Sequence, residues 1–166
     1  MAATVQIHEM SALATGTDKT SGTVRFKAAD NATVDTADRL TVPTSGTNYS
    51  YTKQLRANVT VAPDVDLQDL EAYSDHSDGT SGFGTGVGVQ YDVSGTFAAN
   101  INTNIDGTDL FTKDSGDPID MDGTNTGPHT GTGYQGDLLR LQMTVADTAS
   151  QGQLTPETLT FSYTET

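Results

Sequence analysis

The chain has 166 residues, of which 34% are hydrophobic, and its formal net charge is −14 because eight Lys and Arg face 22 Asp and Glu. This acidity argues against nucleic-acid binding, which needs clustered cations at the phosphates, and against binding to anionic lipid surfaces. Disulfides and thiol chemistry are excluded because the chain has no Cys. The abundant Thr, Gly and Asp disfavour long helices. We therefore expect an all-β protein that forms a single domain over residues 1–166.

Apolar and polar side chains alternate with the two-residue period of a strand in the first half of the chain. The predicted strands are residues 3–10, 23–28, 39–42 and 49–61. Residues 11–22 are expected to form a loop. On the longest run, Leu55 and Ala57 share the apolar face with Lys53, and Gln54 and Arg56 lie on the opposite face. On 23–28, Val24, Phe26 and Ala28 form the apolar face and Arg25 and Lys27 the other.

The second half of the chain continues the same alternation. Strands are predicted at residues 87–93, 97–105, 137–145 and 158–163, and Leu110–Phe111 begins another short piece. On 137–145 the inward residues are Leu139, Leu141, Met143 and Val145. Residues 67–73 fit either a helical turn or an irregular strand. About eight to ten strands at this spacing are typical of an antiparallel β-sandwich or a jelly-roll-like fold with little or no helix.

Both the first and the last predicted strand lie close to an end of the sequence. Such strands usually lie at a sheet edge or pair with one another, and an exposed edge can dock another chain. Residues 1–10 lack the basic and apolar regions of a secretory signal, and no apolar run approaches the length of a membrane span. We expect synthesis without signal-dependent export.

Residues 114–137 are rich in Asp and Gly and separate two apolar runs. Asp120, Asp122 and Asn125 resemble the opening of a calcium loop, since oxygen ligands at alternate positions suit a hard cation. The twelfth position of that pattern is Gly131, where an acid would be needed. The alternative is an Asp-rich turn in which each carboxylate bonds its own backbone, with the segment pointing to solvent. Apart from this candidate Ca²⁺, no cofactor is expected.

The other candidate sites are weaker. His76 and His129 lie in Gly-rich loops and could approach one another at a zinc site, but solvent-exposed loop histidines are the simpler interpretation. Ser81 lacks the GxSxG setting of a nucleophile, and the stretch GFGTGVG precedes no predicted helix, which excludes a dinucleotide site. The sequence therefore predicts a non-enzymatic protein.

Exposed aromatic rings are the usual platform for sugars on β-sandwich modules. Tyr134, in a glycine-rich stretch, is the best candidate for such a ring. Tyr49, Tyr51, Tyr91 and Tyr163 fall on the apolar phase of their strands and are expected in the core or in an interface.

The chain resembles the small head decoration (cement) proteins of tailed viruses. The resemblance rests on the missing signal and Cys, on one Thr/Gly/Asp-rich β-domain with strand-like ends, and on an expected C-terminal hairpin, GDLLRLQMTVADTASQGQLTPETLTFSYTET. It implies a virion structural protein on the outer surface of the capsid, synthesised in the host cytoplasm. Its partner would be the major capsid protein, and it would form a homo-oligomer, with a trimer favoured.

Other roles stay open. A tail, fibre or turret module of the same virion is the first alternative, and a carbohydrate-binding or cell-surface module is the second. The acidity has two explanations, a soluble surface that resists association or adaptation to the high salt of a salt-loving host.

Overall fold

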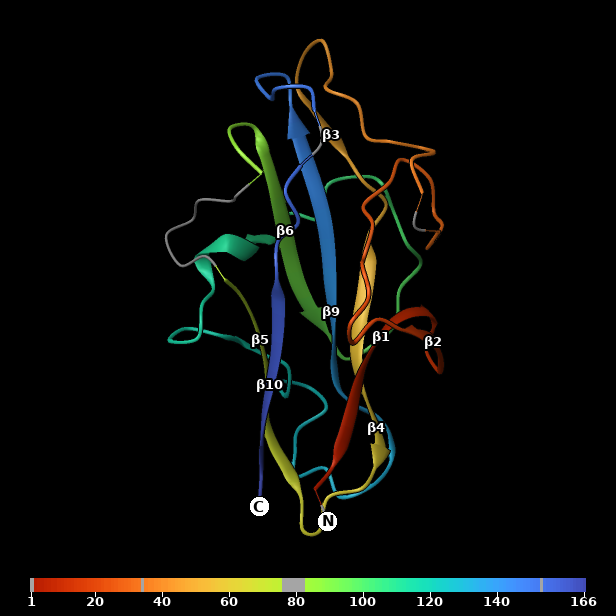
Figure 1. The fold of residues 1–166 in the computed structure, drawn as a ribbon, viewed down its shortest axis with the longest axis vertical. Helices are drawn as coiled ribbons and strands as arrows, with labels where there is room; N and C mark the ends of the chain where they lie inside the picture. Colours follow the sequence, from red (N-terminus) through yellow and green to blue (C-terminus); the bar gives the residue numbers. More distant parts are fainter. Residues whose placement is uncertain (1, 34, 76–82, 153) are drawn as a thin grey trace.

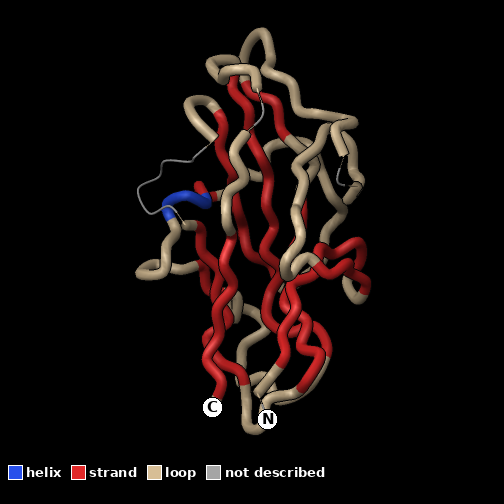
Figure 2. The backbone as a smooth tube through the Cα atoms, viewed as in Figure 1, coloured by secondary structure: helices blue, strands red, loops and turns tan. Residues whose placement is uncertain are grey.

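The structure, a computed structural model, describes residues 2–33, 35–75, 83–152 and 154–166, and it confirms an all-β fold with antiparallel sheets (Figures 1 and 2). The strands are β1 (Thr4–Ala12), β2 (Thr15–Asp18), β3 (Thr47–Tyr49), β4 (Lys53–Val61), β5 (Leu67–Ser74), β6 (Val87–Ser94), β7 (Thr108–Asp109), β8 (Ile119–Asp120), β9 (Gly133–Ala146) and β10 (Leu159–Glu165). One short 3₁₀ helix, η1, spans Leu110–Thr112. No helix in the described part of the chain is long and apolar enough to span a membrane.

The strands form two antiparallel sheets. The larger sheet has the order β2-β1-β4-β9-β6-β7, with β3 also paired to β9, and the smaller has the order β10-β5-β8. The long strand β9 lies at the centre of the larger sheet, paired with β4 on one side and β6 on the other. The expected C-terminal hairpin is wrong, because β9 and β10 belong to different sheets.

The hydrophobic core lies between the two sheets, which gives the sandwich-like fold expected from the sequence. Its buried residues are Leu55 and Ala57 of β4, Val89 of β6, Leu139, Leu141, Met143 and Val145 of β9, Leu70 and Ala72 of β5, Ile119 of β8, and Leu110, Phe111 and Met121. The predicted inward face of residues 137–145 is thus confirmed. Alternation identified this face because a strand buried on one side repeats every second residue.

Several predicted strands have different structures. Residues 15–18, expected in a loop, form β2, while 23–28, 39–42 and 97–105 are assigned to no sheet. The run 49–61 is interrupted at 50–52 between β3 and β4. The ambiguous run at 67–73 is part of β5. The runs 23–28 and 97–105 are held to the larger sheet by isolated hydrogen bonds to Tyr51, Thr52, Gln54 and Gln142 instead of by a strand ladder.

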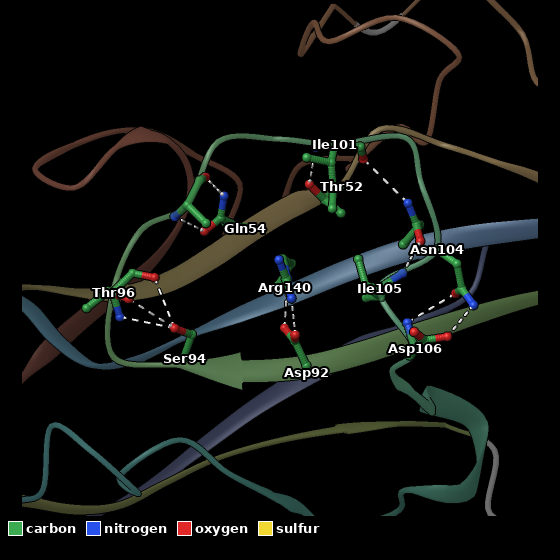
Figure 3. A network of polar contacts seen from close by, with 12 residues as sticks. Thr52, Gln54, Asp92, Ser94, Thr96, Ile101, Asn104, Ile105, Asp106 and Arg140 are labelled. Atoms are coloured by element: carbon green, nitrogen blue, oxygen red, sulfur yellow. Dashed lines mark hydrogen bonds and ion pairs between the residues drawn. The ribbon is translucent and has the colours of Figure 1, made fainter.

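The segment 95–107 covers the outer face of the larger sheet (Figure 3). Gln54 donates to the carbonyl of Ala98 at 2.6 Å, and the amide of Thr52 donates to the carbonyl of Ile101 at 2.9 Å. Gln142 donates to the carbonyl of Thr103 at 3.0 Å. Gln54 and Gln142 are therefore almost completely buried. The polar face of β4 is thus covered as well as its apolar face.

A second covering segment, residues 22–42, packs on the core-facing side of the larger sheet, beside β1 and β4. Val24 and Phe26 contact the core, as their alternation indicates. Lys27, predicted on the opposite face of this run, is only 3% exposed and donates to the side chains of Asn31 and Asp35. The Lys27 amine is held inside because these two oxygens replace its lost water.

Candidate partner-binding surface

A mostly apolar groove of about 290 Å³ opens between β1 and β10. These strands lie side by side along one flank of the sandwich, with the chain ends at the same pole (Figure 1). Each wall and the floor contribute apolar side chains: Val5 and Ile7 from β1, Leu159, Phe161 and Tyr163 from β10, and Ala57, Leu70 and Met121 beneath them.

The wall formed by β1 has a partly uncovered backbone edge. β4 pairs with β1 from Thr4 to Glu9, but on the other side β2 pairs only from His8 onward. Ile7 is the last residue covered there, since its amide donates to the Thr20 hydroxyl and its carbonyl accepts from the Lys19 amide. Outward-pointing backbone groups recur every second residue along a paired strand, so those of Val5 face the same side.

The opposite wall is an edge strand. β10 pairs with β5 on one side, and no other strand of the described chain pairs with it. The two walls are tied together at one end, where the Ala3 amide donates to Glu165 at 2.9 Å. Beside this tie, Thr166 and Asp66 exchange backbone hydrogen bonds at 3.1 and 3.5 Å. The groove is therefore closed at the chain ends and flanked above them by two strand edges.

A bulge in β9 shapes the base of the groove. The pairing of β4 with β9 shifts between Leu55 and Ala57, where Gly136 adopts a positive φ of 64°. Positive φ is easily reached by glycine alone, and such a bulge bends its strand. Asp137 consequently leaves the ladder, and its amide donates to the carbonyl of Met121 at 2.6 Å.

The bulge places a buried carboxylate beneath the groove. Asp137 is 2% exposed and accepts hydrogen bonds from the amides of Thr124 and Asn125 at 2.8 and 2.9 Å, and from the Asn125 side chain at 2.6 Å. Burial lowers the pKa of the nearby Arg56 guanidinium, an effect that the Asp137 charge opposes. Asp137 is the one charged residue among those that line the groove, in the part of the chain that the structure describes.

The three predicted calcium ligands, Asp120, Asp122 and Asn125, all form hydrogen bonds within the protein, close to the base of the groove. Asp120 accepts from the amide of Asp122, as in an Asp-rich turn. Asp122 accepts from the amide of Leu70 at 3.0 Å and lies 2.8 Å from the ring nitrogen Nε2 of His129, while Asn125 donates to Asp137. These contacts hold the loop against β5 and β9. Among the described residues, no group of three or more His, Cys, Asp or Glu is placed to hold a metal ion.

His129 corrects the sequence-based expectation of exposed loop histidines. Its side chain is 7% exposed, its ring contacts Asp122, and its backbone exchanges hydrogen bonds with Leu67 at 2.9 and 3.0 Å. The Asp/Gly segment 114–137 is thus partly anchored in the core, through Ile119, Met121 and this pair, and does not point wholly to solvent. His76 and Ser81 lie outside the described residues.

The tyrosine predictions are confirmed only in part. Tyr134 is half-buried in β9, and its hydroxyl lies 3.1 Å from Nδ1 of His8, so it is not the freely exposed ring expected of a sugar platform. Tyr91 packs against the core. Tyr163 is 40% exposed and lines the groove. Sequence reasoning identified the strands that form the groove but not the groove itself, because alternation does not show how far apart two strands lie.

Comparison with protein-family models, with curated proteins and with solved structures found no match to this chain.

Proposed function

We propose that this protein is a non-enzymatic structural component of a virion, a decoration protein on the outer face of the capsid. The observation that carries the proposal is the flank formed by β1 and β10, where two strand edges border an apolar groove. Unpaired strand edges are a liability in an isolated soluble protein and a docking surface in an assembly. The natural partner on this proposal is the major capsid protein, and the natural assembly is a trimer.

The mechanism of such a protein is linkage between binding and stability. A ligand that binds only one state of its target stabilises that state. A decoration protein that binds the assembled shell and not its separate subunits would therefore strengthen the shell. The acidic surface suits this role, since a net charge of −14 per chain keeps free trimers apart until a complementary surface is offered.

Immunogold labelling of purified virus particles from the source culture, with an antibody against this chain, tests the proposal. Even labelling over the heads is the expected result. Labelling confined to tails or vertices would replace it with a tail, fibre or turret module. Particles without any label would overturn the virion role.

A further inference from the structure

We propose that the groove between β1 and β10 captures an extended segment of a different protein. This segment would have apolar residues at alternate positions and Lys or Arg at its flanks. It would pair with the open edge of β10 and insert its apolar side chains between the two walls. The capture of such a segment does not depend on the proposed function; only its assignment to the major capsid protein rests on that function.

The backbone of the groove favours an extended occupant. β10 presents the outer edge of a seven-residue strand, Leu159–Glu165, and Val5 presents outward backbone groups on the facing wall. A strand added to a sheet edge gains main-chain hydrogen bonds along its length, and the pockets for alternate side chains then set specificity. Added beside β10, it would extend the smaller sheet toward β1.

The side chains favour a row of short apolar groups. At about 290 Å³ the groove lies just below the range for small-molecule pockets, roughly 300–1,000 Å³. Its lining is mainly Val5, Ile7, Leu159, Phe161 and Tyr163, from the two walls. Because successive strand residues point to opposite faces, every second residue of the captured segment would enter it.

Charge identifies the kind of partner. No Lys or Arg lines the groove within the described part of the chain, and acidic residues stand around it: Asp137 at the base, Glu165 at the closed end and Asp18 beside Thr20. Basic flanks on the captured segment complement this surface and accelerate encounter. A second copy of this chain is a poor occupant, since with eight Lys and Arg against 22 Asp and Glu it offers few basic flanks to this acidic groove. A trimer of this chain would therefore form through other surfaces.

Synthetic peptides test the inference with the purified full chain. The probe is a peptide of about ten residues in which Val and Thr alternate between paired Lys, a length that matches a typical strand. One control peptide has the same composition in scrambled order, and another has Glu in place of Lys. In fluorescence anisotropy titrations we expect the alternating, Lys-flanked peptide to bind about tenfold more tightly than either control.

Matched variants locate the binding. Tyr163→Ala removes a groove side chain that is 40% exposed, and Leu13→Ala removes one that is 55% exposed and does not line the groove, so neither change opens the core. We expect Tyr163→Ala to weaken the probe about fivefold and Leu13→Ala to leave it unchanged. Val5→Lys should weaken binding of the probe further, because the new Lys side chain places a cation in the path of the captured segment.

Three results would overturn the inference: no saturable binding of the probe, equal binding by the Tyr163→Ala protein, or self-association that depends on Tyr163 without peptide binding. The peptide titration involves no virus particle, so its outcome is separate from the immunogold result. Labelled heads without groove-dependent peptide binding would leave the virion role standing and remove this site. Groove-dependent peptide binding without labelled particles would support this site and overturn the virion role.

Discussion

The amine of Lys53 lies 3.0 Å from a carboxylate oxygen of Glu9, and their side chains are only 2% and 6% exposed. The other Glu9 oxygen lies 3.5 Å from the amine of Lys19. Lys53 also donates to the backbone carbonyl of Asn31, whose side chain accepts from Lys27. Three of the four lysines thus form one buried network that fastens the covering segment 22–42 to β1 and β4.

Lys53→Met is expected to destabilise the protein by about 3–5 kcal/mol, because it removes the closer partner of the buried Glu9 carboxylate and leaves only the more distant Lys19 amine. Urea unfolding measures the change in free energy. The double variant Glu9→Gln with Lys53→Met is the control, and it should recover part of the loss because it removes both charges. A single variant within about 1 kcal/mol of the unaltered protein would contradict the buried pair.

The same network hides most amines from solvent, which predicts selective labelling. The side chain of Lys113 is 21% exposed, whereas the side chains of Lys27 and Lys53 are 4% and 2% exposed. Under native conditions, an amine-reactive reagent should modify Lys113 and leave Lys27 and Lys53 unmodified. Peptide mass mapping reads out each position, and unfolding in urea before labelling should make all four lysines reactive. Equal native labelling of Lys53 and Lys113 would contradict the packing of residues 22–42.

Asp137→Asn is expected to cost about 2–3 kcal/mol. The substitution removes the charge that accepts three hydrogen bonds from Thr124 and Asn125, and bonds to a charged acceptor are worth about 1.5–3 kcal/mol each. Chemical denaturation measures the loss, and amide exchange at residues 122–126 should rise. Asp114→Asn is the control. Asp114 also accepts hydrogen bonds from two amides, those of Gly116 and Asp117, but in a solvent-exposed turn where water can replace them, so this change should alter stability by less than about 0.5 kcal/mol.

Acid should weaken the contact between Lys27 and Asp35. The hydrogen bond from Lys27 lowers the pKa of Asp35 below its ordinary value. A carboxyl group with a lowered pKa adds stability above its unfolded-state pKa and loses it as the pH falls through the folded-state pKa. The melting temperature should therefore drop more between about pH 5 and pH 2 in the unaltered protein than in Asp35→Asn. Parallel curves for the two proteins would contradict this contribution.

Salt should stabilise the fold. Screening shortens the repulsion among the surplus of 14 negative charges, from a Debye length of about 10 Å at 0.1 M to about 3 Å at 1 M. We expect the melting temperature to rise from about 0.1 M to about 1 M NaCl, and KCl should act similarly if screening is the cause. A flat or falling melting temperature would favour the simpler explanation, an acidic surface without adaptation to salt.

The sequence predicted the fold class because a strand buried on one face repeats every second residue, as β9 shows with Leu139, Leu141 and Met143. It misassigned residues 23–28 and 97–105 for the same reason. An extended segment lying across a sheet alternates just as a paired strand does. The period records which side chains are buried and carries no information on which backbone groups are paired.

The burial of several polar residues was also not predicted from the sequence. Gln54, Arg56 and Gln142 have the polarity of a solvated face, yet segment 95–107 or the bulge of β9 supplies their hydrogen-bond partners. Similarly, the buried position of His129 depends on Asp122 and Leu67. These contacts join residues far apart in sequence or follow from the loop conformation, so a single sequence offers no signal for them.

The central claim is that β1 and β10 form the surface that contacts the particle. Hydrogen–deuterium exchange of the free protein, compared with the protein bound to purified heads, tests it most directly, because pairing protects edge amides. We predict slower exchange at Val5 and at residues 159–163 on binding, with the β1–β2 turn around Leu13 unchanged. Protection confined to other surfaces, with unchanged exchange along β10, would contradict the account.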